Sequence, residues 1–419
     1  MSTNEISTQC CVVGGGPAGM MLGFLLARAG VNVVVLEKHG DFLRDFRGDT
    51  VHPSTLELMH ELGILNEFLK LPHQEVTQLG AQIGGEQLTI VDFSHLPTKC
   101  KFIALMPQWD FLDFLADQAK RYSTFNLHLN TEAIGLIEED DRITGVIAKT
   151  KDGEVRIKAD LVVGADGRTS IVRQCANLEV EDVGAPMDVL WMRLSRKESD
   201  PAQTLGRVDT GVFFIMLNRG DYWQCGYIIA KGTIDKFREE GIEAFRERIV
   251  KIAPFTADRV NELKSFDDVK LLTVKVDRLN QWYHQGLLCI GDSAHAMSPV
   301  GGVGINLAIQ DAVATANILY KPLLENRCTE QDLKLVQARR TYPTRMTQRL
   351  QVAIQNNVVS ATLNNQKPVT VPWFMNSFKI LPALRGIPAT VIGMGFRPEH
   401  IHTPDVLRTK QTTTTGAEI

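Results

Sequence analysis

The chain lacks the features typical of membrane, secreted or nucleic-acid-binding proteins. Among its 419 residues no apolar stretch of about 18 residues is free of charge or proline. The first residues, MSTNEISTQ, lack the basic and apolar regions of a secretory signal. The formal net charge is only −4, whereas nucleic-acid-binding proteins usually carry a basic face. We therefore expect a cytoplasmic protein without a membrane span or a nucleic-acid partner.

Cysteine is also scarce, and its spacing is not that of a disulfide framework. The seven cysteines are scattered, without C-x-x-C pairs, and most lie in apolar runs. Since no cluster of His, Cys, Asp and Glu has metal-ligand spacing, we expect no metal. With 44% hydrophobic and 22% charged residues the composition is ordinary for a globular protein. The length predicts two domains, or one domain with a large insertion.

The most informative stretch is QCCVVGGGPAGMMLGFLLARAGVNVVVLEK, which begins at Gln9. Its pattern is that of a strand, a glycine turn, a helix, a second strand and an acid. The first strand is 10–13, and Gly14, Gly16 and Gly19 follow it in G-x-G-x-x-G spacing. The helix comes next, then the second strand, 31–36, and finally Glu37. This order predicts a Rossmann-type unit that binds a dinucleotide. The alternative is an ordinary glycine-rich turn.

Each residue of this motif has a physical task. Gly14 permits the turn, Gly16 lets the backbone approach a pyrophosphate, and Gly19 lets helix and strand pack closely. The N-terminus of the helix presents N–H groups and a positive dipole end to the phosphates. Glu37, at the end of the second strand, can accept two hydrogen bonds from a ribose diol.

A second candidate turn follows the apolar run 161–163. This run predicts a buried parallel strand that rejoins the first sheet. It ends at Asp166 and Gly167, with Ser170 and Arg173 about one helical turn apart.

A third candidate turn follows the apolar run 287–290. It begins with Gly291 and Asp292, and a glycine-rich loop leads from it into a helix that starts near Gly304 and contains Asn306. Asp292 is placed to grip a sugar-like polyol, and the helix can direct its positive end at a group that gains negative charge. The alternative is a second turn needed only for packing.

The remaining segments predict a second sheet. Alternating runs between 76 and 102 predict short strands, and the region 177–270 contains a long antiparallel hairpin from Gly211 to Ile229. A helix begins near Pro53. Arg47, in the loop before that helix, is either a solvated charge or a guanidinium directed at cofactor phosphates.

Together the three turns resemble one family. Their order and separation are similar to those of the group A flavoprotein monooxygenases, which include para-hydroxybenzoate hydroxylase and the aromatic ring hydroxylases. The resemblance covers roughly residues 8 to 340. It implies an α/β fold: a Rossmann-like FAD-binding domain of the glutathione-reductase type, an inserted mixed-sheet substrate domain and a helical C-terminal segment.

We expect the domain boundaries to follow this arrangement. The expected parts are an FAD-binding domain at 1–75, 101–176 and 271–340, a substrate domain at 76–100 and 177–270, a C-terminal helical segment at 341–405 and a tail at 406–419.

The resemblance also implies which residues contact the cofactor, a non-covalent FAD. The glycine turn would bind the pyrophosphate, Glu37 the adenosine ribose and Asp292 the ribityl hydroxyls, with Pro299 close to the reacting face. The implied contacts are Gly14, Gly16, Pro17, Ala18, Gly19, Glu37, Lys38, Arg47, Gln108, Ala133, Asp166, Asp292, Pro299, Gly302, Gly304, Ile305 and Asn306. Many family members carry a polar residue in place of Gly302 or Val303, so control of the flavin position differs here.

The chemistry implied by the resemblance is hydroxylation. NAD(P)H would reduce FAD, O₂ would form a flavin C4a-hydroperoxide, and the terminal oxygen would pass to an electron-rich substrate. In the family the Asp166-Gly167 motif serves both FAD and NAD(P)H, so no second dinucleotide fold is needed. Two other functions stay open: a flavin reductase of the same fold that acts without O₂, and a non-enzymatic flavin-binding redox sensor.

Candidate catalytic residues are few, because this chemistry requires no protein nucleophile. They are Pro299 at the flavin and, for proton handling, His52 and His295. A lone histidine is more often structural. The sequence leaves open the substrate, the choice between NADH and NADPH, and the oligomeric state.

The predicted hairpin supplies candidate substrate contacts. It carries Phe213, Met216 and Trp223 with almost no charge, and strand alternation sends about half of such residues to each face. In the resembling family this sheet roofs the flavin, so we expect Trp223 to touch the substrate. A roof without a fixed cation favours a neutral aromatic or polycyclic compound. The alternative is that these residues belong to the core.

Overall fold

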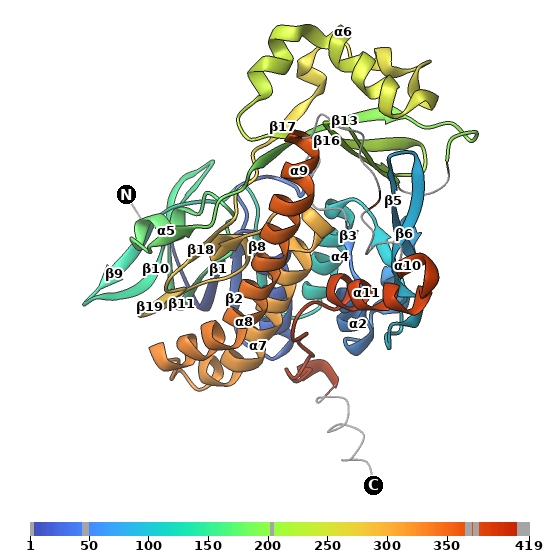
Figure 1. Ribbon diagram of the computed structural model, residues 1–419. Helices are drawn as coiled ribbons and strands as arrows, with labels where there is room; N and C mark the ends of the chain where they lie inside the picture. Colours follow the sequence, from blue (N-terminus) through green and yellow to red (C-terminus); the bar gives the residue numbers. More distant parts are fainter. Residues whose placement is uncertain (1–3, 44–49, 202–204, 365–370, 372–376, 409–419) are drawn as a thin grey trace.

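The computed structural model describes residues 4–43, 50–201, 205–364, 371 and 377–408. Two large sheets dominate the fold, one of eight strands and one of seven, with the seven-stranded sheet uppermost in Figure 1. Two three-stranded sheets complete the β-structure of the described chain. One contains β12 (Val180–Asp182), β18 (Asp277–Leu279) and β21 (His295–Ala296), and the other β3 (Thr50–Val51), β7 (Ile103–Leu105) and β4 (Gln74–Val76). The mixed α/β fold predicted from the sequence is confirmed.

The eight-stranded sheet is built around parallel strands from distant parts of the chain. Its order is β19-β20-β11-β1-β2-β8, and a β9–β10 hairpin extends it beside β11. The strands are β1 (Asn4–Val13), β2 (Val33–Leu36), β8 (Phe125–His128), β9 (Glu132–Glu139), β10 (Arg142–Thr150), β11 (Gly153–Gly164), β19 (Tyr283–His284) and β20 (Leu287–Cys289). The predicted strand at 161–163 is the end of β11, where Leu161 lies opposite Cys10 in a parallel pair. Its apolar run fits a strand covered on both faces.

Long helices cover this sheet. α1 (Pro17–Arg28) is buried from Ala18 to its end and contacts both α4 (Gln108–Ala119) and α7 (Gly304–Leu324). α8 (Glu330–Ile354) packs in turn on α7. α1 lies close to the sheet because Gly23 has no side chain: a Cβ there would lie 2.6 Å from Val35. Shorter helices are α2 (Pro53–Glu61), α3 (Leu65–Phe68) and α5 (Ile171–Cys175).

The seven-stranded sheet has the order β17-β13-β16-β15-β14-β5-β6 and is mixed, because β14 pairs with β5 in parallel. Its strands are β5 (Gln78–Ile83), β6 (Glu86–Asp92), β13 (Met187–Ser195), β14 (Leu205–Asp209), β15 (Val212–Asn218), β16 (Tyr222–Ala230) and β17 (Lys270–Leu272). The predicted hairpin is β15 and β16. Segment 78–92 therefore shares a sheet with strands more than a hundred residues later, not with β1.

The two faces of this sheet have different coverings. α6 (Ile234–Ile252) lies over one face, at the top of Figure 1. The core beneath α6 contains Leu190, Met192, Leu194, Phe214, Met216, Trp223, Cys225 and Tyr227. The alternate residues form what we call the inner face: Val189, Trp191, Phe213, Ile215 and Ile228, which cluster with Val300, Val359 and Leu363. The inner face is thus directed toward the central sheet and the end of α8.

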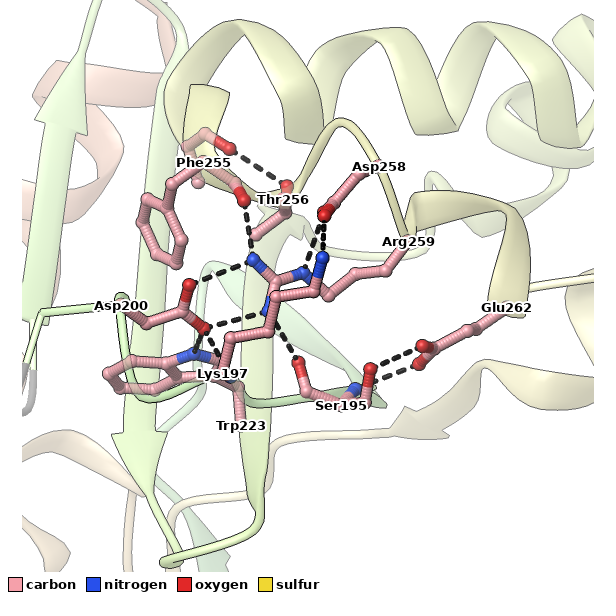
Figure 2. A network of polar contacts seen from close by, with 10 residues as sticks. Ser195, Lys197, Asp200, Trp223, Phe255, Thr256, Asp258, Arg259 and Glu262 are labelled. Atoms are coloured by element: carbon pink, nitrogen blue, oxygen red, sulfur yellow. Dashed lines mark hydrogen bonds and ion pairs between the residues drawn. The ribbon is translucent and has the colours of Figure 1, made fainter.

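A buried ion pair fixes the α6 side of the sheet, as Figure 2 shows. Arg259 donates to both carboxylate oxygens of Asp200 at 2.8 Å each, and Asp200 also accepts the Nε1–H of Trp223 at 2.9 Å. All three side chains are buried. Burial alone would raise the pKa of Asp200, but hydrogen bonds from Arg259, the Lys197 backbone and Trp223 lower it. The carboxylate therefore stays charged inside the domain.

After α8 the chain first reaches the seven-stranded sheet and then returns to α8. η7 (Gln355–Ser360), a π-helix, and α9 (Ala361–Asn364) continue α8 to the inner face. α10 (Ser377–Ile380) and α11 (Gly386–Gly393) pack near β6. Ion pairs hold the last described stretch, with Glu399 bound to Arg340 at 3.1 Å. Within the described ranges, no helix is long and apolar enough to cross a membrane.

Breaking the Asp200–Arg259 pair should destabilise the fold. In Asp200→Ala, Arg259 loses its buried carboxylate and Trp223 loses its acceptor, so the free energy of unfolding should fall by about 3 kcal/mol or more. Urea unfolding of the apoprotein measures this change. Lys197→Ala is the matched control, because Lys197 pairs with Asp258 on the surface and should unfold like wild type. Equal urea midpoints for the two variants would contradict the assigned role.

Candidate functional site

The glycine turn after β1 contains glycines of two kinds. Gly14 has a φ of +109°, and a Cβ there would lie 2.4 Å from the oxygen of Ala165. A Cβ on Gly19 would lie 1.9 Å from the oxygen of Gly14. Gly16 differs, because its φ is −74° and a Cβ there would meet nothing within 4 Å. The described protein gives no reason for glycine at position 16, and the open space lies at an uncapped helix N-terminus, which fits a phosphate group.

Glu37 holds this turn from the end of β2. Its Oε2 accepts from the backbone N–H of Gly15 at 3.1 Å, and its Oε1 accepts from that of His39 at 3.0 Å. The side chain is only 8% exposed. A carboxylate fixed at the end of the second parallel strand stands where dinucleotide folds bind a ribose diol.

The second turn lies beside the first. Ala165, whose backbone would clash with a side chain on Gly14, leads into Asp166. Asp166 caps α5: its Oδ2 accepts from the N–H groups of Ile171 and Val172 at 2.8 and 3.2 Å. Its Oδ1 is buried and has no partner among the described residues. Burial raises the pKa of Asp166. Because Oδ1 has no partner among the described residues, it can form a hydrogen bond with a ligand.

The third turn also reaches this place. A Cβ on Gly291 would lie 3.1 Å from Ala308 and 3.2 Å from Ala18, so the turn packs between the starts of α1 and α7. Asp292 accepts from Arg168 Nε at 3.1 Å. The sequence analysis did not anticipate this pair, although Arg168 directly follows Asp166-Gly167. The ends of β1, β11 and β20 thus form one edge, the usual ligand-binding edge of such a sheet.

The glycine loop before α7 is tied to the segment that begins at β3 (Thr50–Val51). Asn306 Oδ1 accepts from the hydroxyl of Thr55 at 2.7 Å, and the hydroxyl of Thr50 donates to the oxygen of Gly302 at 2.9 Å. Gly302 has a φ of +63°, and a Cβ there would lie 2.8 Å from Thr50 Oγ1. This contact and the positive φ explain why the loop carries glycine at this position.

Three buried glutamines hold the segment that leads into this loop, and the sequence analysis missed them. They contact residues 296–300 and are Gln348, Gln351 and Gln355. Gln351 binds Ser298 twice, accepting from its N–H at 3.1 Å and donating to its oxygen at 2.9 Å. These hydrogen bonds hold the backbone on both sides of Pro299. The only available signal was the helical spacing of the three glutamines.

Both candidate histidines are built into the fold. His52 is fully buried, its Nδ1 lies 2.7 Å from the oxygen of Ile392, and burial lowers its pKa to about 4. His295 Nε2 lies 2.6 Å from Asp311, which also accepts from Arg340 at 2.8 Å. Burial alone would raise the pKa of Asp311, but its interactions with His295 and Arg340 outweigh burial and lower that pKa. This arrangement favours the structural alternative for both.

The other predicted cofactor contacts lie on helices, on strands, in loops or, in one case, outside the described residues. Their places are: Pro17 and Ala18 in the first turn of α1, Lys38 exposed after Glu37, Gln108 at the start of α4, Ala133 buried in β9, Ile305 in the first turn of α7, and Arg47 outside the described residues.

The structure corrects the predicted substrate contacts on the hairpin. Trp223 and Met216 are fully buried in the core beneath α6, on the side away from the glycine loop. Alternation was predicted correctly, but α6 covers the face that carries these residues, and Trp223 binds Asp200 there. Phe213 does lie on the inner face, in the cluster that includes Val300.

Comparison with known proteins decides the family. The sequence model of a family described as FAD binding domain matches residues 7–349. The chain belongs to this FAD-binding family. It is 33% identical over 357 residues to 6-methylpretetramide 4-monooxygenase of Streptomyces rimosus, covering 85% of each chain. It is 28% identical over 325 residues to an uncharacterized aromatic compound monooxygenase of Bacillus subtilis, covering 73% of this chain and 60% of that one.

A solved structure agrees with the fold of this FAD-binding family. The p-nitrophenol 4-monooxygenase of Pseudomonas putida superposes with a TM-score of 0.72 at 18% identity, covering 99% of this chain and 98% of its own. The chain is thus an FAD-dependent monooxygenase, an oxidoreductase acting with O₂ on a small molecule. The three turns fit FAD through the open space at Gly16, the unpaired oxygen of Asp166 and the polyol-binding capacity of Asp292.

Filling the space at Gly16 should abolish cofactor retention without unfolding the protein. Gly16→Val adds a side chain whose Cβ would meet no described atom within 4 Å, but it would occupy the space that we assign to the pyrophosphate. The Kd for FAD should rise roughly tenfold or more, while the circular dichroism and urea midpoint of the apoprotein stay unchanged. Gly386→Val is the matched control, since Gly386 has a φ of −68° and equally open surroundings. Wild-type FAD affinity in Gly16→Val would reject the pyrophosphate position.

Mild acid should destabilise the protein through His52. The pKa of His52 is lowered from 6.5 to about 4 in the folded protein, so the unfolded chain binds the proton first as the pH falls. The stabilisation is complete above pH 6.5 and is lost progressively toward pH 4. At pH 5 the loss in the free energy of unfolding should be about 2 kcal/mol. Urea unfolding at pH 8 and pH 5 measures it, and a His52→Gln variant should lose less over the same interval. Parallel losses in the two proteins would show that His52 does not titrate as described.

Proposed function

We propose that the protein is an NAD(P)H-dependent monooxygenase that hydroxylates a neutral polycyclic aromatic compound lying against the inner face. The observation that carries this proposal is the apolar composition of two adjacent rows of the inner face across its central strands. FAD, when bound, supplies the activation of O₂ that this chemistry requires. The protein supplies binding, orientation and exclusion of water.

Two rows of paired residues cross the inner face. The first row contains Val189, Ile228, Phe213, Val208 and Ile83, on β13, β16, β15, β14 and β5. The second contains Trp191, Gly226, Ile215, Gly206 and Ala81 on the same strands. Charged residues enter these rows only at the outermost strands, with Lys270 beside Trp191 and Glu86 beside Ile83. A carboxylate substrate would lack a cation here, whereas a neutral aromatic surface would be well matched.

The second row combines small residues with large ones. Gly206 and Ala81 leave the sheet surface low beside Ile215, and a Cβ on Gly206 would approach no atom closer than 3.4 Å. Glycine is therefore not required by packing at this position. Phe213 and Ile215 are only half-buried. A flat ring system suits this surface, since aromatic groups stack well on exposed apolar side chains.

The inner face and the loop before α7 lie side by side. Val300, the neighbour of Pro299, packs in the inner-face cluster. α7 begins at Gly304 without a side-chain cap, so its first N–H groups would stabilise negative charge on the cofactor. The hydrogen bond from the Ser298 N–H to Gln351 fixes Pro299 next to that helix start. The chain thus orients a substrate between a rigid loop and an apolar sheet.

The domain arrangement and the relatives support this reading. We assign 76–100 and 177–270 to a substrate domain, since β5 and β6 join β13–β16 in one sheet, and 1–75, 101–176 and 271–340 to the FAD-binding domain. One relative, 33% identical to this chain over 357 residues, is named as acting on 6-methylpretetramide, a polycyclic compound. Its name favours the polycyclic substrate class.

Oxygen uptake tests the proposed function. With FAD-loaded protein and NADPH or NADH, 6-methylpretetramide should stimulate NAD(P)H oxidation and O₂ uptake together, and the product should gain the mass of one oxygen atom. The anionic para-hydroxybenzoate should give no stimulation, because the central rows of the inner face offer no cation.

Three outcomes would contradict the proposal in different ways. Substrate reduction that proceeds only without O₂ would indicate a reductase. Stable FAD binding without NAD(P)H oxidation in the presence of any aromatic compound would indicate a sensor. Strong stimulation by para-hydroxybenzoate would leave the monooxygenase activity standing but reject the neutral substrate class.

A further inference from the structure

The two tryptophans at the centre of the seven-stranded sheet use their N–H groups differently. Trp223, beneath α6, donates to Asp200 at 2.9 Å. Trp191 has a buried Nε1 for which the described chain offers no acceptor. Buried indole N–H groups usually have a partner, because leaving one unpaired costs about 1–3 kcal/mol. An unpaired buried donor therefore calls for an explanation.

Trp191 lies on the inner face. Its neighbours along β13, Leu190 and Met192, belong to the core beneath α6, whereas Trp191 belongs to the cluster that contains Val300. The unpaired N–H is thus on the same side of the sheet as the loop that carries Pro299. It lies among apolar side chains, where a hydrogen bond is stronger than in water.

The ring of Trp191 is held in one orientation. Gly226 lies opposite it on β16, and a Cβ on Gly226 would approach Cζ3, Cη2 and Cε3 of the indole at 3.1, 3.3 and 3.4 Å. The six-membered ring therefore covers Gly226, and a larger residue there would displace it. Glycine at position 226 thus makes room for the Trp191 ring, whose N–H has no partner among the described residues.

We propose that Trp191 is a specificity-determining residue whose indole N–H donates a hydrogen bond to an oxygen substituent of the aromatic substrate. The acceptor is a phenol or ketone oxygen, since such an oxygen accepts a hydrogen bond from an indole N–H. This inference rests on the proposed function and adds to it a required feature of the substrate. It also replaces Trp223 with Trp191 as the tryptophan that contacts substrate.

A pair of matched ligands tests this role. 1-Naphthol and 1-methylnaphthalene have the same ring system and nearly the same shape, but only the first carries an oxygen. Their Kd values are measured from the change in flavin absorbance of the FAD-loaded protein, without turnover. Wild type should bind 1-naphthol more tightly than 1-methylnaphthalene. Trp191→Phe should weaken 1-naphthol binding roughly five- to tenfold and leave 1-methylnaphthalene binding unchanged.

Trp223→Phe is the matched control. It also removes one indole N–H from the same sheet, but on the face beneath α6, so it should lower the urea midpoint and keep the preference for 1-naphthol. Equal 1-naphthol affinity in wild type and Trp191→Phe would overturn the inference while leaving the proposed function intact. Equal weakening of both ligands in Trp191→Phe would also overturn it, by showing a packing role. Failure of wild type to bind either ligand would reject the aromatic substrate class and this inference with it.

Discussion

The backbone contact between Gly14 and Gly19 is the constraint on which the rest of the fold depends. Because neither residue has a side chain, α1 starts directly against the end of β1. That position buries α1 along its length and lets it contact α4 and α7 at once. It also leaves the first N–H groups of α1 at the edge where β11 and β20 end. One close approach thus determines both the packing of the central domain and the place where negative charge is favoured.

Segments that are far apart in the sequence meet at the loop before α7. Residues 50–55 bind Gly302 and Asn306, while the glutamines of α8 and η7 bind residues 296–300. One turn further along α7, the buried Asp311 joins His295 to Arg340, and Arg340 joins Glu399. The protein's own side chains therefore hold the loop in place. Such pre-organisation lowers the entropy that binding must overcome.

The sequence predicted the parts of this structure that depend on local pattern. The glycine turn, the parallel strand at 161–163 and the β15–β16 hairpin all follow from spacing and alternation. Alternation could divide Trp223 from Phe213, but it could not tell which face α6 covers, because that depends on contacts such as Asp200 with Arg259. The contacts of Gln348, Gln351 and Gln355 could not be predicted from the sequence either. Gln351 lies in a charged helix and gains its meaning only from a backbone segment about fifty residues earlier.

The pairing of β1 has a consequence for synthesis of the chain. β1 is made first, yet its parallel partner β11 ends at Gly164, and β20 and α7 follow only after residue 286. Every strand of the seven-stranded sheet lies between 78 and 272, so all its strands are synthesised before β20 of the eight-stranded sheet. Non-local pairing of this kind is slow to form and exposes apolar segments meanwhile. During synthesis the seven-stranded sheet can therefore form first, before the partners that bury β1 and α1 have been made.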